Sequence, residues 1–313
     1  MAGKAACSAE RKMRITIAGD IGSGKTTIAR ELAKRVAVEM RSTGGIQRQL
    51  ATTRGITTLE LNRLAETDAA IDRQIDHYLK TLPDGNLVVE SRMAWRFVPN
   101  TRKTFLYVLR HEAANRILRA NRSDESYELL DDAVAQISER RKSEVKRFKT
   151  YYDVNIDNLR NYDRVIDTTF ASPDSVVERI MRPDTFQSSP GIWLNPKNLV
   201  PTCPAKHLNE QAVEHLARSM ATGGFNESRP IEVVYVEHAF FVVDGHARCA
   251  AAIRVDVEFV PLTLIACEDE PYGSGSTARS FVENVVTDDV ISAWEQALKF
   301  RFPHPIWKMP HHA

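Results

Sequence analysis

Short apolar runs alternate with longer stretches of helical period over residues 15–180 of the 313-residue chain. Apolar runs that repeatedly precede helix-forming stretches are typical of helices packed on a parallel β-sheet. The pattern therefore predicts an α/β domain over residues 13–181. Its expected strands are 14–18, 87–90, 104–109 and 164–167, and its expected helices are 25–40, 58–80, 111–121 and 127–151.

A polar stretch with two prolines, two serines and a glycine, residues 182–191, interrupts this pattern and predicts a linker. Shorter elements of mixed type follow, so residues 192–270 are expected to form a small α+β domain. Residues 271–313 are expected to form a helical extension and a tail. The expected strands of this half are 231–236, 240–243 and 258–266, and its expected helices are 209–222, 246–254 and 281–300.

Residues 19–26 read Gly-Asp-Ile-Gly-Ser-Gly-Lys-Thr, directly after the first expected strand and before the first expected helix. Glycines let backbone N–H groups curl around a polyphosphate, and the helix N-terminus favours negative charge. The motif in this context predicts a phosphate-binding P-loop. Lys25 is expected to reach the β- and γ-phosphates of ATP, and Thr26 to ligate Mg²⁺. The predicted nucleotide-binding residues are Gly19, Asp20, Ile21, Gly22, Ser23, Gly24, Lys25, Thr26 and Thr27.

The charges nearly cancel, with 42 Lys and Arg against 41 Asp and Glu. No overall basic excess exists to recruit nucleic acid or an anionic membrane, so any such partner must bind a local patch. The four cysteines show no Cys-x-x-Cys spacing, and no apolar run approaches membrane-spanning length. These features predict a cytoplasmic protein without a membrane partner.

Three further segments follow the P-loop in order: Ser-Thr-Gly-Gly-Ile-Gln-Arg at 42–48, Val-Val-Glu-Ser-Arg at 88–92 and Arg-Arg-Lys-Ser-Glu-Val-Lys-Arg at 140–147. Together with the P-loop they resemble the archaeal-type cytidylate kinases of the nucleoside monophosphate kinase group. The resemblance covers about residues 13–180. It implies a parallel sheet flanked by helices and Mg²⁺-dependent transfer of the γ-phosphoryl group of ATP to a pyrimidine nucleotide such as CMP.

Transfer of a phosphoryl group between two polyanions requires cations that converge from several parts of the chain. Arg48 and Arg92 are expected to bind the acceptor phosphate, because a guanidinium pairs with phosphate through two hydrogen bonds. Arg140 and Arg147 share one helix face, with Glu144 between them. The resemblance implies that both arginines belong to a lid over the phosphates and that Glu144 contacts the acceptor nucleotide. The expected catalytic residues are Lys25, Arg140 and Arg147.

Residues 241–252 read as a strand that passes through an Asp-Gly turn into a helix. With Leu194-Asn-Pro, Gly224-Phe225, Arg229-Pro-Ile231 and Val260-Pro261 in order, this segment resembles the ParB/sulfiredoxin-like fold over about residues 192–267. The glycine permits the turn, and the first N–H groups of the helix attract anions. The predicted second phosphate site consists of Asp244, Gly245, His246 and Arg248.

Three departures from the cytidylate kinase pattern keep the phosphoryl acceptor open. In the P-loop, Asp20-Ile21 stands where a pair that contains proline is common. Ser91 stands where that family usually has glycine, and Gln47 stands where an aromatic residue is frequent. One alternative is a kinase for a hydroxyl, either on a modified base in DNA of the hydroxymethyluracil type or on a free amino acid such as serine. The other alternative is a non-catalytic, nucleotide-sensing regulator. DNA is thus a candidate partner through the acceptor site or the second domain, and the sequence does not fix the oligomeric state.

Overall fold

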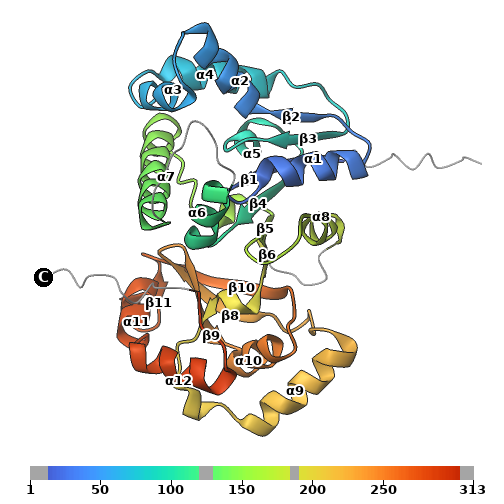
Figure 1. Cartoon of the computed structure of the whole chain (residues 1–313), viewed down its shortest axis with the longest axis vertical. Coiled ribbons are helices and arrows are strands. Elements are labelled where there is room, and N and C mark those ends of the chain that lie inside the picture. The colour runs from blue at the N-terminus through green and yellow to red at the C-terminus, as the bar shows by residue number, and fades with distance from the viewer. Residues whose placement is uncertain (1–12, 120–129, 184–189, 304–313) are drawn as a thin grey trace, which may run out of the picture.

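The computed structural model describes residues 13–119, 130–183 and 190–303. Within these ranges one mixed sheet of ten strands runs through the molecule, in the order β2-β3-β1-β4-β5-β6-β10-β8-β9-β7 (Figure 1). Chain segments before and after residue 190 contribute neighbouring strands to this sheet. Helices lie along its sides and at both ends (Figure 1).

The N-terminal half of the sheet is entirely parallel. Its central strand β1 lies between β3 and β4, and all six of its residues are buried. Strands that are covered on both faces read as apolar runs without alternation, which is the pattern of this part of the sequence. The strands are β1 (Arg14–Gly19), β2 (Met40–Ser42), β3 (Leu87–Glu90), β4 (Arg102–Tyr107) and β5 (Arg164–Asp167).

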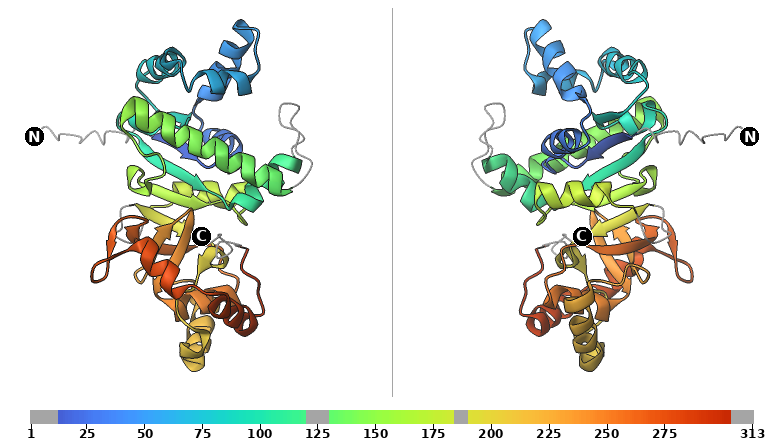
Figure 2. Two further views of the ribbon diagram at one scale, coloured as in Figure 1. Left: turned by 90° about the vertical axis from the view of Figure 1, so that its left-hand side faces the viewer. Right: turned by 90° about the vertical axis from the view of Figure 1, so that its right-hand side faces the viewer.

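Helices cover both faces of these parallel strands. α1 (Lys25–Arg35) and α8 (Pro173–Met181) pack together on one face, and α6 (Arg110–Arg119) and α7 (Leu130–Tyr152) pack together on the other (Figure 2). A separate helical group lies beyond β2 (Figure 1). It consists of α2 (Thr43–Thr53), α3 (Thr58–Leu64) and α4 (Ala69–Lys80), and the short α5 (Ala94–Phe97) follows β3. Within the described ranges, no helix is both long and apolar enough to span a membrane.

The C-terminal half extends the sheet from β5. β6 pairs with β5 in parallel, with Ile192 opposite Val165, and then with β10 in antiparallel orientation. The strands here are β6 (Gly191–Leu194), β7 (Leu199–Val200), β8 (Ile231–Val236), β9 (Ala239–Asp244) and β10 (Val260–Cys267), with a small hairpin of β11 (Pro271–Tyr272) and β12 (Ser276–Thr277). The α-helices here are α9 (Glu210–Gly223), α10 (His246–Arg254), α11 (Ala278–Val285) and α12 (Asp288–Leu298). The 3-10 helices in the described ranges are η1 (Leu159–Asn161), η2 (Pro196–Asn198) and η3 (Ala205–His207).

The two halves share a hydrophobic core and a buried polar network. Phe105 and Tyr107 of β4 belong to the same apolar cluster as Phe240 and Phe241 of β9. At the end of β5, the buried carboxylate of Asp167 accepts hydrogen bonds from the Asn195 N–H at 3.1 Å and from Asn198 Nδ2 at 2.5 Å. A buried carboxylate needs such donors, because its desolvation is otherwise costly. The junction is therefore packed and hydrogen-bonded like a protein interior.

The structure confirms the expected parallel sheet with flanking helices. Residues 184–189 of the expected linker and residues 304–313 of the expected extension lie outside the described ranges. Gly191, the last residue of the expected linker, begins β6. The sheet therefore continues directly from residues 13–181 to residues 192–270, and their division into two domains stays a prediction.

Three expected helices were wrong in extent. The helix at 25–40 ends at Arg35, because Ala37 adopts a left-handed conformation with φ 51°. The helix at 58–80 is two helices, since Asp68 caps the start of α4 by accepting the Ala70 N–H at 2.9 Å. The helix at 281–300 is also two, because the Thr287 hydroxyl caps α12. Of the helix expected at 127–151, residues 127–129 lie outside the described ranges.

The junction strand gives a stability prediction. Ile192 of β6 is completely buried between β5 and β10, whereas Ile265 of β10 is 40% exposed. We expect Ile192→Ala to lower the free energy of unfolding by about 2–5 kcal/mol, because the deletion leaves a cavity in the shared core. The matched change Ile265→Ala should stay within about 0.5 kcal/mol of the wild type in urea unfolding. Equal effects of the two substitutions would contradict a core that continues across the junction.

Candidate active site

The P-loop connects β1 to α1 with a backbone that needs glycine. Gly22 and Gly24 have φ values of 78° and 77°, in the left-handed region. A Cβ on Gly22 would also lie 2.8 Å from the Cα of Ala113 in α6, so the loop packs closely on that helix. Gly24 caps α1 without a side-chain hydrogen bond to the first turn. The first N–H groups of α1 are thus free of any side-chain cap.

Lys25 lies at the start of α1 and folds back over the loop. Its Nζ donates to the Asp20 carbonyl at 2.5 Å and to the Gly19 carbonyl at 3.1 Å. Burial, together with the charge of Arg92, lowers the pKa of Lys25 to about 7, while Glu90, Asp20 and Glu144 oppose this shift. Thr26 and Thr27 lie exposed on the next positions. A desolvated ammonium beside an uncapped helix N-terminus is suited to a polyanion such as ATP.

Arg116 of α6 connects the P-loop to a neighbouring segment of the chain. Its guanidinium donates to the carbonyls of Thr168 at 2.5 Å, Thr169 at 3.0 Å and Gly22 at 3.4 Å. Each of these is a backbone acceptor, so the side chain connects the P-loop to the segment after β5. The sequence did not predict this contact, because it joins segments far apart in the chain.

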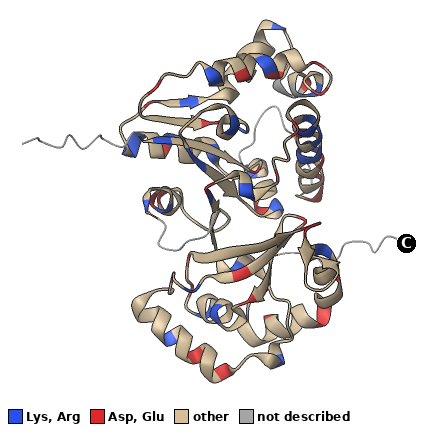
Figure 3. Ribbon diagram, turned by 180° about the vertical axis from the view of Figure 1, so that it is seen from behind, with Lys and Arg blue, Asp and Glu red and all other residues tan. Residues whose placement is uncertain are grey.

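Glu144 is the centre of a cluster of arginines. Lys and Arg residues gather along α7 (Figure 3), and Glu144 lies between two of the predicted site residues there. Its carboxylate is 2.5 Å from Arg92 Nε and 3.5 Å from Arg140 Nε. Burial would raise the pKa of Glu144, but the charges of Arg92, Arg140, Arg141 and Arg147 hold it below its ordinary value. The structure thus brings Arg92, Glu144 and Arg140 together, with Arg92 close enough to influence Lys25.

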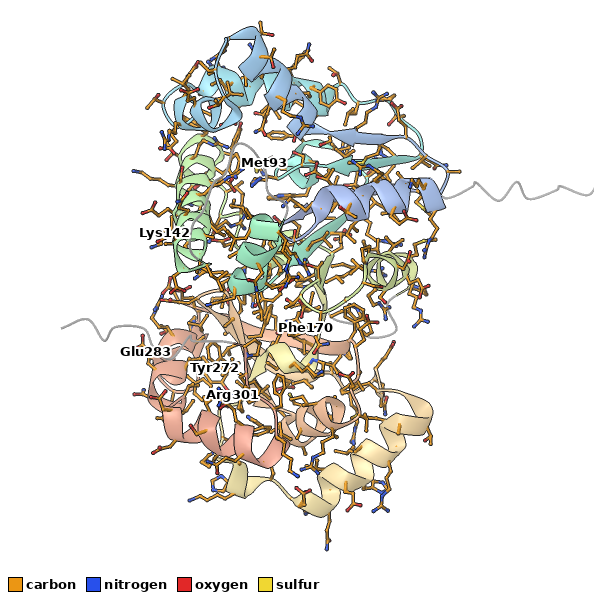
Figure 4. The ribbon with its side chains drawn as sticks, in the orientation of Figure 1. Met93, Lys142, Phe170, Tyr272, Glu283 and Arg301 are labelled. Atoms are coloured by element: carbon orange, nitrogen blue, oxygen red, sulfur yellow. The ribbon has the colours of Figure 1, made fainter. Side chains whose placement is uncertain are left out.

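One side of α7 faces the sheet and the other faces outward. Met93, directly after Arg92, is buried and lies between α7 and the sheet, whereas the exposed Lys142 is on the outer side of the helix (Figure 4). Glu144 is close enough to Lys25 to influence its pKa, so the cluster around Glu144 lies on the side of α7 that faces the P-loop.

Arg147 and Arg48 are not among the arginines in closest contact with Glu144. Arg147 Nε is 3.4 Å from Asp72 Oδ2 of α4, and both side chains are buried. Burial raises the pKa of Asp72 to about 6, with Arg147 opposing and Asp76 adding to the shift. Arg147 thus connects α7 to the helical group beyond β2. Arg48 lies on α2 in that group and makes no ion pair with any residue in the described part of the chain.

Sequence reasoning missed three charged residues of this region. Glu90 ends β3 and accepts the Ser42 hydroxyl at 2.5 Å, and Arg141 pairs with Asp157. Asp72 is the partner of Arg147. Glu90 was visible as a carboxylate at the end of an expected strand beside Arg92. Arg141 and Asp72 had no comparable signal, because their roles depend on contacts between separate helices.

The predicted second phosphate site has its residues at the connection from β9 to α10. Gly245 has φ 95°, and Arg248 Nη2 is 2.6 Å from Asp244 Oδ2. His246 points inward, where its Nε2 accepts the Thr202 N–H at 3.2 Å. Burial lowers the pKa of His246 to about 4, against the opposing charge of Asp244. The imidazole is therefore neutral near pH 7 and serves as a backbone acceptor.

Metal-binding side chains do not cluster anywhere in the described ranges: no group of three or more His, Cys, Asp or Glu residues is placed to hold an ion. A divalent ion at the P-loop would therefore rely on a hydroxyl, single carboxylates, water and the phosphates of the nucleotide, which is usual for Mg²⁺ in nucleotide-binding proteins.

Comparison with known proteins places the N-terminal half in a family. The cytidylate kinase of Natronomonas pharaonis is 39% identical over 167 residues, which cover 52% of this chain and 85% of that protein. The cytidylate kinase of Thermoplasma volcanium is 36% identical over 176 residues, covering 54% of this chain and 90% of that protein. The shikimate kinase structure from Bacteroides thetaiotaomicron aligns with 54% of this chain and 96% of its own, at 18% identity and a TM-score of 0.39. Residues 14–170 match the cytidylate kinase-like family, and the chain belongs to that family.

Proposed function

We propose that this phosphotransferase moves the γ-phosphoryl group of ATP to a pyrimidine nucleotide of the CMP type. The observation that carries the proposal is the position of Lys25 and Arg92 beside the uncapped N-terminus of α1. Lys25 is suited to the phosphates of ATP, and Arg92 is suited to the phosphate of the acceptor. The relatives named cytidylate kinase, matched over most of their own length, supply the class of acceptor.

In the proposed mechanism, the loop residues Gly19–Thr27 bind the triphosphate through backbone N–H groups. Lys25 leaves the carbonyls of Gly19 and Asp20 and binds the phosphate oxygens instead. Thr26 would hold Mg²⁺, which would supply positive charge to the β- and γ-phosphates. The exposed position of Thr26 is compatible with this role.

The arginines of the Glu144 cluster are proposed to bind the transferring group and the acceptor. Arg92 and Arg140 now share Glu144 as their counter-ion, and an arriving phosphate offers a stronger one. Arg48 approaches the acceptor phosphate from α2, and Arg147 holds α7 against α4 through Asp72. No general base is required, because a phosphate acceptor oxygen is already ionised.

For the C-terminal half we propose a ParB/sulfiredoxin-like unit that binds a nucleotide or another phosphate-bearing ligand. The uncapped start of α10 and the guanidinium of Arg248 support an anion site there. Asp244 holds Arg248, and Gly245 provides the turn. Because His246 is engaged with Thr202 and has a low pKa, we propose binding rather than proton transfer for this half.

Phosphoryl transfer from γ-labelled ATP with Mg²⁺ tests the proposal directly. The acceptors to compare are CMP, dCMP, UMP, hydroxymethyl-dUMP, DNA that contains hydroxymethyluracil, and free serine. We expect labelled nucleoside diphosphate from a pyrimidine monophosphate, and a loss of at least about a hundredfold in Lys25→Ala, because the cation at the transferring group is gone. The control Arg30→Ala changes an exposed cation on the same helix and should retain the activity.

The remaining outcomes separate the alternatives. Label on DNA or serine, with none on any monophosphate, would replace the nucleotide acceptor by a hydroxyl. Tight ATP binding without label on any acceptor would favour a nucleotide-sensing regulator. Loss of transfer in Arg248→Ala would show that the C-terminal half takes part in the chemistry.

The low pKa of Lys25 predicts a pH-dependent affinity for ATP. The ammonium form binds phosphate, and the free protein loses this proton as the pH rises through about 7. Binding of MgATP must then take up a proton, so its dissociation constant should increase by up to about tenfold per pH unit between about pH 7 and 9. Titration calorimetry in buffers of different ionisation enthalpy measures both the affinity and the proton uptake.

Lys25→Arg is the matched control for this dependence, because a guanidinium stays protonated over the whole range. The variant should bind MgATP with an affinity that does not change with pH. A wild-type affinity that is constant between about pH 7 and 9 would contradict the assignment of Lys25.

A further inference from the structure

A residue of the C-terminal half reaches the P-loop. His238 lies in the turn between β8 and β9, and its Nε2 is 3.2 Å from Asp20 Oδ2 and 3.2 Å from the Val108 carbonyl. Asp20 is the second residue of the P-loop motif, and Val108 follows β4 directly. The turn therefore contacts the phosphate-binding loop itself and the strand end beside it.

The imidazole of His238 is fixed on every side. Its Nδ1 is 3.0 Å from the Tyr235 hydroxyl, and its ring packs against Tyr107 with centroids 4.9 Å apart. The Tyr107 hydroxyl donates to the His238 carbonyl at 2.9 Å. Because Nε2 faces a carboxylate and a carbonyl, both of them acceptors, that nitrogen must carry a hydrogen. His238 thus donates to the loop in its neutral and in its charged form.

The turn that presents His238 is itself held in an uncommon conformation. Glu237 and His238 have φ values of 47° and 68°, which residues other than glycine rarely adopt. Arg279 of α11 fixes the turn from the other side, with Nη1 2.6 Å from Glu237 Oε1. A strained backbone conformation persists only where the surrounding structure fixes it, and such positions are common at active and ligand-binding sites.

Asp20 links the side chain of His238 to the phosphate-binding atoms. Its buried carboxylate accepts the Val108 N–H at 3.0 Å as well as the His238 hydrogen bond. Its carbonyl accepts the Lys25 ammonium at 2.5 Å and the Ser23 hydroxyl at 2.8 Å. Burial would raise the pKa of Asp20, but His238, Arg141 and the Val108 N–H hold it below its ordinary value. The carboxylate is therefore charged, and its donors determine where the carbonyl points.

We propose that His238 is a positioning residue of the ATP site, through which the C-terminal half completes the P-loop. The inference rests on the proposed function, since it assigns the bound polyanion to ATP. Without the His238 donor, a charged carboxylate next to the triphosphate would lack one of its partners. It would either repel the phosphates or turn away and change the conformation of the loop that binds them.

Binding of a non-hydrolysable ATP analogue with Mg²⁺ to the full chain tests this inference. His238→Phe keeps a ring against Tyr107 and removes the donor, and we expect it to weaken binding by about tenfold or more. His238→Gln restores an N–H donor of similar reach and should bind within about threefold of the wild type. The double variant Asp20→Asn/His238→Phe should bind more tightly than His238→Phe alone, because the unpaired charge is then absent.

Two controls separate positioning from general stability. Arg160→Ala breaks another contact between the halves, the 2.7 Å pair with Glu270, and should leave the affinity within about twofold. Thermal unfolding of each variant shows whether it is folded. If His238→Phe does not fold, His238→Asn takes its place, because its shorter amide cannot reach Asp20, and it should weaken binding by at least about fivefold.

The outcomes distinguish this inference from the proposed function. A wild-type chain that does not bind the analogue would overturn the proposed function. A wild-type chain that binds it, with His238→Phe or its replacement binding equally well, would overturn the role of His238 alone. A double variant that is weaker than His238→Phe would also contradict an action through Asp20.

Discussion

The hydrogen-bonded position of Asp20 is the constraint on which the candidate active site depends. The carboxylate of Asp20 accepts hydrogen bonds from Val108, directly after β4, and from His238 in the β8–β9 turn. Its carbonyl accepts hydrogen bonds from Lys25 and Ser23. A buried carboxylate is stable only with its donors in place. The P-loop conformation is thus coupled to the packing of strands from both halves of the sheet. The family match ends at residue 170, yet His238, one of the donors to this carboxylate, comes from beyond it.

A second constraint is the balance of charge between α7 and the segment that follows β3. Several arginines would repel one another in the cluster if Glu144 did not stand among them. This internal counter-ion keeps Arg92 and Arg140 near the P-loop before any substrate binds. The ion pair between Arg147 and Asp72 holds the helical group beyond β2 against α7. In our proposal, the phosphates of the substrates replace the Glu144 carboxylate as the partner of Arg92 and Arg140.

The parts of the structure that depend on local sequence were predictable. β3, β5, β8 and α10 have the bounds expected from their apolar patterns and their turns, and β1, the P-loop and α1 follow in the expected order. Helix ends were less predictable, because single residues such as Ala37 and Asp68 decided them through backbone conformation and capping. The pairing of β5 with β6 could not be inferred from the sequence. A polar stretch separates these two strands, and the residues of a parallel strand do not indicate which strand it pairs with.

Contacts between distant segments were beyond sequence reasoning. The motifs named Lys25, Arg92, Arg140 and Glu144, but not that Glu144 would pair with Arg92. Nothing in the residues around His238 indicates a contact with the P-loop, because that contact depends on how β8 and β9 fold against β4. Periodicity and motif spacing describe single elements, whereas such sites arise from the packing of several elements.

Hydrogen–deuterium exchange of the full chain with and without MgATP tests the central claim most directly. Our account places the nucleotide at residues 19–27 and connects that loop to the β8–β9 turn through Asp20 and His238. It predicts slower exchange in both segments when MgATP is bound, with little change in α9. Protection that is absent from the P-loop, or confined to it while the turn exchanges as before, would contradict the account.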